Sequence, residues 1–326
     1  MASRHIERIR RGRGFIYFHD GRQLTAQETV GRLNALRVPP AWRGVKISVS
    51  PNAKIQATGY DKADRLQYIY HPKFRAAKEK EKFERILKFA RALPKMRQTV
   101  NKHLSSEGLN REKILATIVK LMDEAYFRVG TEEYARDNQH YGISTLRTRH
   151  VSVEGDTITF DFVGKSGQRQ RQKLTNRRLA NIIKQLDELP GYEMFKYFDD
   201  NGELVKVDSE EVNGYIKEVM GDGFSAKDFR TWGGTLLATA ELSAAERARN
   251  KNERKKMVTV CVQKVARKLG NTPAIARSSY IDPRVIASFV ETNDLAKVKQ
   301  TVRDVGSGSY LSSDERCVLK LLERTV

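Results

Sequence analysis

The segment around one tyrosine, Tyr280, is where this 326-residue chain could do chemistry. Tyr280 lies nine residues after Asn271, and Pro273 and Pro283 stand on either side of it. Because proline lacks an N–H group and is tolerated in the first turn of a helix, we expect a short helix that begins near Pro273 and ends at Tyr280. The phenol would then lie on a turn, with its hydroxyl free to point into a cleft. A single tyrosine is a weak signal, and an inert, half-buried side chain is the alternative.

Two arginines and a lysine also lie in sequence contexts that could indicate a chemical role. Arg128 follows the apolar face of a predicted helix over 111–127, and Arg230 begins another apolar helix three residues after Lys227. A buried guanidinium is costly unless an anion pairs with it. The anion could be a ligand or a nearby carboxylate, and the candidate carboxylates are Asp123, Glu124 and Asp228. Lys165 lies at the tip of a predicted hairpin, where a solvated lysine is the usual alternative.

The positive charge of the chain is concentrated in two blocks. The chain has 60 Lys and Arg against 40 Asp and Glu, and its net charge is +20. Residues 1–78 contain 16 basic and 5 acidic side chains, and residues 245–277 contain 10 and 2. These blocks have net charges of +11 and +8, so they account for nearly all of the excess. We infer two surfaces that bind one polyanion, most simply nucleic acid.

Several classes of function are excluded by what the sequence lacks. Its two cysteines, Cys261 and Cys317, form no close-spaced pair, which argues against a disulfide framework and against a paired-cysteine zinc site. No zinc-protease, phosphate-loop or calcium-loop motif occurs, so we expect neither a metal nor a nucleotide cofactor. No apolar run resembles a signal peptide or reaches membrane length, so we expect a soluble, cytoplasmic protein without a membrane partner.

The order of predicted elements indicates an α+β chain in two parts. Residues 1–75 read as a β-rich N-terminal domain that begins with a basic lead-in over 4–13. A capping box at Thr25–Glu28 predicts the start of its helix. We expect strands over 15–18, 45–49, 55–58 and 66–70.

From Pro72 the pattern becomes mainly helical. A charged helix over 74–93, with Pro94 as its stop, lies in the predicted connection over 76–97. The catalytic domain would then occupy 98–326. Within it we expect three antiparallel strands over 148–153, 157–163 and 168–174. The predicted helices cover 98–104, 111–127, 176–190, 208–221, 225–241, 243–269, 283–298 and 312–324.

Taken together, the chemical residues resemble a known family. Arg128, Lys165, Lys227-x-x-Arg230, Asn271 and Tyr280 occur in the order and approximate spacing of the type IB DNA topoisomerases, and more distantly of the tyrosine recombinases. The local sequences resemble the small poxvirus-type and bacterial members. The segments concerned are Tyr126-Phe-Arg-Val-Gly130, Tyr141-Gly-Ile-Ser-Thr-Leu146, Phe162-Val-Gly-Lys-Ser-Gly167, Lys227-Asp-Phe-Arg-Thr-Trp232 and Gly270-Asn-Thr-Pro273.

This resemblance implies a fold and an activity. The expected fold is a small β-rich domain and a larger, mostly helical catalytic domain with a three-stranded sheet, which together clamp duplex DNA. The expected enzyme is a nucleoid-associated monomer that relaxes supercoiled DNA without ATP or metal. The alternatives are a site-specific tyrosine recombinase, which should carry His-x-x-Arg in place of Lys227-x-x-Arg230, and a non-enzymatic architectural DNA binder.

The resemblance also implies a role for each residue. Tyr280 would form a 3′-phosphotyrosyl link, and Arg128 and Arg230 would bind the non-bridging oxygens of the phosphate. Lys165 would protonate the leaving 5′ oxygen, with Lys227 as a possible relay. Asn271 stands where poxvirus members usually carry histidine, and it is interpreted as a hydrogen-bond donor that cannot act as an acid or base.

A second group of residues is expected to contact DNA in the N-terminal domain. Gln67, Tyr68 and Tyr70 stand where family members contact the major groove. Glutamine can bind adenine, and tyrosine can touch phosphates or thymine methyl groups. Simple packing of the two tyrosines on one face of a strand remains the alternative.

Overall fold

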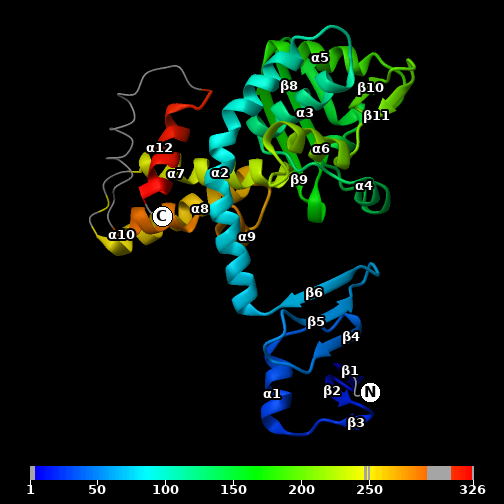
Figure 1. The fold of residues 1–326 in the computed structure, drawn as a ribbon, viewed down its shortest axis with the longest axis vertical. Coiled ribbons are helices and arrows are strands. Elements are labelled where there is room, and N and C mark those ends of the chain that lie inside the picture. The colour runs from blue at the N-terminus through cyan, green and yellow to red at the C-terminus, as the bar shows by residue number, and fades with distance from the viewer. Residues whose placement is uncertain (1–3, 246–247, 249, 292–309, 325–326) are drawn as a thin grey trace. The chain divides into compact units, whose positions relative to one another are not determined.

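The computed structural model describes residues 4–245, 248, 250–291 and 310–324, which form two compact units over Met1–Lys82 and Phe83–Val326. Figure 1 shows the elements of each unit. The first unit contains an antiparallel sheet and the second is mainly helical, so the α+β class expected from the sequence is confirmed. Residues 292–298 of the helix predicted over 283–298, and residues 246, 247 and 249 of the one predicted over 243–269, lie outside the described residues.

The first unit is a six-stranded sheet with one helix packed against it. The strands lie in the order β3-β2-β1-β4-β5-β6, and helix α1 (Gln27–Ala35) buries Leu33 in their core. The strands are β1 (His5–Arg11), β2 (Gly14–His19), β3 (Arg22–Gln23), β4 (Arg43–Ser48), β5 (Ile55–Tyr60) and β6 (Leu66–Tyr70).

Two expectations for this unit were wrong. The basic lead-in is strand β1, which pairs with both β2 and β4 and buries Ile6. The capping box at Thr25 does not form, because α1 has Ala26 as its N-cap and no side chain caps it. Leu24 explains the difference, since its N–H still bonds the Tyr17 carbonyl at 2.8 Å and keeps the chain extended there.

Pro94 does not stop its helix. Helix α2 runs without interruption over Pro72–Leu104, so the two helices predicted on either side of Pro94 are one. An internal proline costs about 3 kcal/mol. The helix also buries Ile86, Phe89, Leu93 and Met96, and each such side chain contributes about 1.5–3 kcal/mol. Packing therefore outweighs the local penalty.

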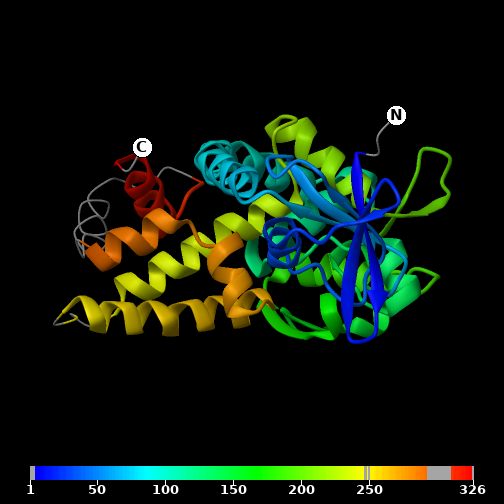
Figure 2. The same ribbon diagram turned by 90° about the horizontal axis from the view of Figure 1, so that it is seen from below.

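The core of the second unit is built from helices. The central pair is α7 (Ala226–Ser243) and α8 (Lys251–Leu269), which lie side by side in both ribbon views (Figures 1 and 2). The other helices are α3 (Arg111–Ala125), α4 (Glu132–Asn138), α5 (Arg177–Asp187), α6 (Ser209–Met220), α9 (Pro273–Ser279), α10 (Pro283–Glu291) and α12 (Ser313–Arg324). None of the described helices is long and apolar enough to cross a membrane.

A three-stranded antiparallel sheet completes the second unit. Strands β7 (Val151–Glu154), β8 (Thr157–Val163) and β9 (Arg169–Thr175) pair in that order, as the sequence predicted. The β8–β9 hairpin closes with the short 3₁₀ helix η3 (Lys165–Gly167). Two further 3₁₀ turns, η1 (Ile143–Thr145) and η2 (Thr148–His150), and a small hairpin of β10 (Lys196–Phe198) and β11 (Leu204–Lys206) lie between the larger elements.

Candidate active site

Two arginines from different elements converge on one amide oxygen. Arg230, in the second turn of α7, donates from Nη2 to Asn271 Oδ1 at 2.8 Å, and Nη2 of Arg128 donates to the same oxygen. Arg128 also binds the Gly270 carbonyl at 3.1 Å, and Arg230 binds that of Leu269 at 2.8 Å. The last residue of α8 and the two residues after it therefore fix both guanidinium groups.

Neither arginine is neutralised. Within the described residues, Arg128 and Arg230 form no ion pair, although Arg230 is only 4% exposed. The carboxylates that could have paired with them have other partners: Asp123 binds Arg97, Glu124 binds Lys120, and Asp228 binds Arg85. Nε of Arg230 is buried without any partner in the described structure. The site therefore holds two cations and unused donors that suit an anionic ligand.

Tyr280 lies beside these cations. Helix α9 begins at Pro273 and has Tyr280 as its C-cap, as predicted. The Tyr280 ring is half-buried, and its centroid is 5.0 Å from Cζ of Arg230. Burial alone raises the pKa of this phenol, but the charge of Arg230 and its hydrogen bond, with the charges of Arg128 and Lys227, lower the pKa below its ordinary value.

Burial also lowers the pKa of Arg230, and the nearby charge of Arg128 adds to this effect. The pKa of Arg128 is lowered mainly by burial. An arginine stays protonated at neutral pH despite such shifts. Both pKa shifts come mainly from burial of the guanidinium groups, which is unfavourable for a charge that no anion pairs with.

Two neighbouring glycines in α7 make room for the tyrosines of the site. A methyl group on Gly234 would lie 2.5 Å from the Tyr280 carbonyl oxygen, and one on Gly233 would lie 2.3 Å from the Tyr126 ring. The hydroxyl of Thr235 then donates to the Tyr280 carbonyl at 3.3 Å. Sequence reasoning missed this contact, and the only signal was a glycine pair inside an apolar helical pattern.

Arg128 is held by the chain on both sides of it. Helix α3 ends at Ala125, and its C-cap Tyr126 has a φ of +58° that turns the chain sharply. The Tyr126 carbonyl accepts a hydrogen bond from Nη1 of Arg230. The Arg128 carbonyl accepts from the N–H of Ile143 at 2.7 Å. The Tyr141–Leu146 segment therefore fixes the backbone that presents the guanidinium.

The two lysines approach the site differently. Lys227 lies in the first turn of α7, and its charge is among those that lower the pKa of Tyr280. Lys165 is exposed in the η3 turn, where Ser166 has a φ of +62°. In the described structure its side chain makes no hydrogen bond or ion pair. The structure therefore gathers Arg128, Arg230, Asn271, Tyr280 and Lys227, and leaves Lys165 on an adjoining hairpin.

The predicted DNA-contacting residues of the first unit are divided between the two faces of β6. Tyr68 and Tyr70 stack with ring centroids 6.0 Å apart, and they are 45% and 41% exposed. Gln67 lies on the opposite face because side chains alternate along a strand, and its Nε2 donates to Asp61 at 3.1 Å. The structure brings the two tyrosines together and does not bring Gln67 to them.

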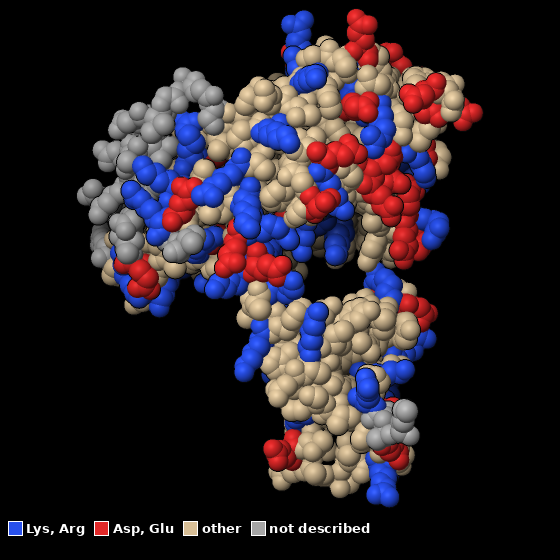
Figure 3. All heavy atoms as spheres, in the orientation of Figure 1, with Lys and Arg blue, Asp and Glu red and all other residues tan. Residues whose placement is uncertain are grey.

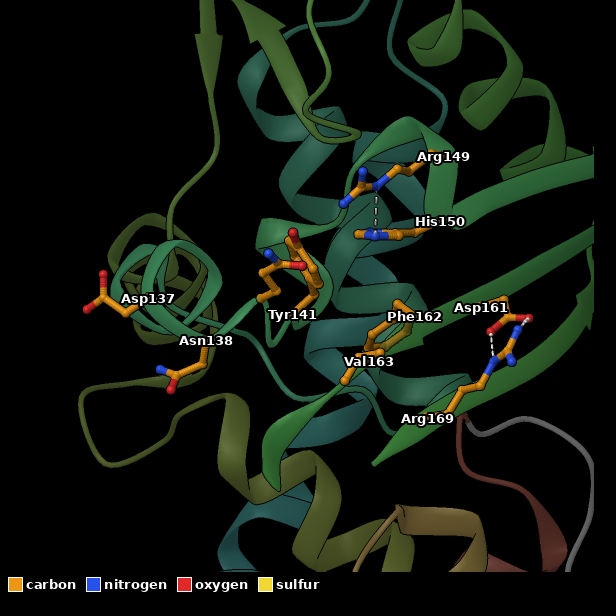
Figure 4. A pocket seen from close by; sticks show the side chains of 10 residues that line it. Asp137, Asn138, Tyr141, Arg149, His150, Asp161, Phe162, Val163 and Arg169 are labelled. Carbon is orange, nitrogen blue, oxygen red and sulfur yellow. Dashed lines mark hydrogen bonds and ion pairs between the residues drawn. The ribbon is translucent and has the colours of Figure 1, made fainter. Parts of the chain in front are cut away.

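A separate hollow lies between the C-terminal end of α4 and the part of the β8–β9 hairpin next to its turn (Figure 4). Its volume is about 580 Å³. Asp161 in its wall is bound by Arg169 at 2.7 Å. Burial, with the charges of Arg149 and Arg147, lowers the pKa of His150 to about 4, so this histidine is neutral at pH 7. The described residues contain no group of three or more His, Cys, Asp or Glu that could hold a metal ion.

Charge is unevenly spread on the surface (Figure 3). Lys and Arg side chains are visible on both units, between larger areas of uncharged residues. Acidic side chains gather around α4, which contains Glu132, Glu133 and Asp137. The excess of positive charge lies in residues 1–78 of the first unit and 245–277 of the second, so each unit has a basic segment suited to a polyanion.

The chain is similar in sequence to known proteins over both of its units. Residues 71–304 match the family model of the eukaryotic DNA topoisomerase I catalytic core, and residues 14–61 match the N-terminal domain of bacterial DNA topoisomerase IB. The chain is 35% identical over 284 residues to DNA topoisomerase 1B of Acanthamoeba polyphaga mimivirus, which covers 85% of this chain and 84% of that protein. It is 23% identical to DNA topoisomerase 1B of vaccinia virus (strain Copenhagen) over 76% of each chain.

The fold, the site and these similarities define the class of the protein as a DNA topoisomerase. The family models that match residues 71–304 and 14–61 identify the family within this class. The chain belongs to the type IB DNA topoisomerase family, whose members are isomerases.

Proposed function

We propose that this chain relaxes supercoiled duplex DNA by cutting one strand transiently and resealing it, with Tyr280 as the nucleophile. The observation that carries the proposal is the pair of arginines without a carboxylate partner beside the Tyr280 phenol. A nucleophile with a lowered pKa next to vacant cationic donors is suited to attack on a phosphodiester.

The covalent step conserves its atoms and its bond energy. Tyr280 Oη forms a bond to phosphorus as the bond from phosphorus to the 5′ oxygen breaks. The phenol loses its proton and the leaving 5′ oxygen gains one, so the products are a 3′-phosphotyrosyl ester and a 5′-hydroxyl strand. The free strand swivels, and the reverse reaction reseals it. Because the ester stores the energy of the broken bond, the cycle needs no ATP.

Arg128 and Arg230 stabilise the transition state in this proposal. Attack makes phosphorus five-coordinate and places negative charge on its two non-bridging oxygens. Guanidinium groups already held by main-chain carbonyls offer donors to these oxygens without reorganising. These fixed cations would do the electrostatic work that a metal ion does in other phosphoryl-transfer sites.

In this proposal Asn271 has a second role besides donating a hydrogen bond to the phosphate. Its Oδ1 accepts from both arginines, so its amide group sets the spacing between them. Its Nδ2 remains available as a donor to a phosphate oxygen. The amide cannot take the proton of Tyr280, but the surrounding cations lower the pKa of the phenol and reduce the need for a base.

Lys165 is proposed as the acid that protonates the 5′ oxygen, with Lys227 as a relay. The η3 turn leaves the Lys165 side chain exposed, so it can enter the site when DNA is bound. We also propose that the enzyme acts as a monomer on the cytoplasmic chromosome, and that Tyr68 and Tyr70 contact DNA.

One assay tests the proposal: incubation of the protein with supercoiled plasmid in EDTA without ATP. The expected result is a ladder of relaxed topoisomers and, on denaturation, a covalent adduct at Tyr280. Strand exchange between sites would indicate a tyrosine recombinase instead. A mobility shift with neither relaxation nor adduct would refute the proposal and indicate a DNA binder.

A further inference from the structure

The hairpin that carries Lys165 contacts Gly270, whose carbonyl binds Arg128, through the side chain of Gln170 in β9. A methyl group on Gly270 would lie 2.2 Å from Nε2 of Gln170, so the amide rests directly against this glycine. A methyl group on Gly164 would lie 3.1 Å from Cγ of the same side chain. Gln170 is therefore in contact with both the residue that precedes the η3 turn and the residue that follows α8.

Both residues that Gln170 touches belong to the site. Gly164 immediately precedes Lys165. Gly270 accepts a hydrogen bond from Arg128 at 3.1 Å and immediately precedes Asn271. Its φ of +60° and the close amide leave no room for another side chain. The amide of Gln170 thus fills the gap between the proposed acid and the groups that bind the phosphate.

The position of Gln170 in the sheet supports a specific role. It pairs with Phe162 in β8 and shares the face of the sheet whose other β8 residues, Phe160 and Ile158, are in the core. Its neighbours Arg169 and Arg171 lie on the other face and bind Asp161. A polar side chain half-buried on an apolar face, against a glycine, is not explained by core packing.

We propose that Gln170 is a positioning residue that sets the location of the Lys165 turn relative to Arg128 and Asn271. The inference rests on the proposed role of Lys165 as the acid. Proton transfer requires the donor within hydrogen-bond reach of the 5′ oxygen. A displacement of about 1 Å can cost roughly 100-fold in rate. Loss of the Gln170 side chain should therefore mimic, in part, the loss of Lys165.

The test is single-turnover cleavage by Gln170→Ala on two duplex substrates, one with an ordinary 5′ bridging oxygen and one with sulfur in its place. Sulfur leaves as a thiolate and needs no acid (a free thiol has a pKa of about 8.5). Gln170→Ala should be about 10- to 100-fold slow on oxygen and nearly as fast as the wild type on sulfur. Combining it with Lys165→Ala should add no further defect on oxygen.

The chain offers a matched control in Gln172. It is the same residue type, two positions along β9 on the same half-buried face, and it pairs with Phe160. Gln172→Ala should cleave both substrates at nearly the wild-type rate. Gln170→Asn, which keeps the amide but is shorter, should lie between the wild type and Gln170→Ala.

The same measurements can overturn the inference. A defect of Gln170→Ala that is equal on oxygen and sulfur would place its effect on Tyr280 or the arginines. An unchanged rate on oxygen would show that the amide positions nothing. If sulfur rescues Lys165→Ala but not Gln170→Ala, the inference alone fails, whereas if it rescues neither, the proposed acid role of Lys165 fails with it.

Discussion

Replacing each active-site arginine by lysine should separate their contributions. A guanidinium has five N–H donors. In the described structure Arg230 donates to the carbonyls of Tyr126 and Leu269 and to Asn271 Oδ1, and it also hydrogen-bonds the Tyr280 phenol. Arg128 uses two, for the Gly270 carbonyl and Asn271 Oδ1. A lysine ammonium has only three donors, so at position 230 it would have none left for the phosphate, and at position 128 it would have one.

The expected rates follow from this count. Loss of one preorganised donor costs about 10²–10³ in rate, so Arg230→Lys should cleave at least about 10²-fold more slowly than the wild type and nearly as slowly as Arg230→Ala. Arg128→Lys should retain more activity than Arg128→Ala. The assay is single-turnover formation of the covalent adduct with a duplex oligonucleotide, with DNA affinity measured in parallel. A milder defect in Arg230→Lys than in Arg128→Lys would refute this reasoning.

Three further predictions concern the nucleophile, the N-terminal unit and the acid. Tyr280→Phe should bind duplex DNA with near-native affinity and form no covalent adduct, and a denaturant-resistant adduct in this variant would assign the nucleophile to another tyrosine. Deletion of residues 1–75 should weaken DNA binding and flatten the slope of log K against log salt, because fewer phosphates are neutralised, and an unchanged slope would show that this block is not on the DNA. Lys165→Ala should be slow on ordinary DNA and nearly restored when sulfur replaces the bridging 5′ oxygen, whereas Arg128→Ala and Arg230→Ala should be slow on both. Equal defects of Lys165→Ala on both substrates would leave Lys227 as the candidate acid.

Local patterns in the sequence were enough to predict much of the fold. The alternation over Thr157–Val163 predicted β8 without error, and Pro273 correctly marked the start of α9. These elements are set by residues near in sequence, namely alternating apolar side chains and a proline in a first turn. The position of Tyr280 at the end of α9 followed from the same local rule.

Contacts between distant segments could not be predicted from the sequence. Pro94 continues its helix because residues elsewhere bury that face of α2, and no local rule contains this energy. Asp228 lies two residues before Arg230, yet it pairs with Arg85 and leaves that arginine free for an anion. The contact of Gln170 with Gly270 joins residues 100 positions apart and has no signature in either segment.

The choice of an amide at position 271 can be understood from what a carboxylate would do there. Asn271 Oδ1 orients Arg128 and Arg230 without cancelling their charge. Asn271→Asp would keep the shape and both hydrogen bonds, but it would add a negative charge and remove the Nδ2 donor. The added charge would raise the pKa of Tyr280, because it opposes the cations that now lower it.

Asn271→Asp should therefore be slower than Asn271→Ala, although the new ion pair with two arginines should leave its melting temperature no lower than that of the wild type. Its rate of adduct formation should continue to rise to a higher pH than that of the wild type, because a phenol with a raised pKa ionises only at a higher pH. Asn271→His restores a donor without a fixed negative charge, and it should be the least impaired of the three variants. Faster cleavage by Asn271→Asp than by Asn271→Ala would show that position 271 supplies a base, and that the charge of the two arginines is not what the site preserves.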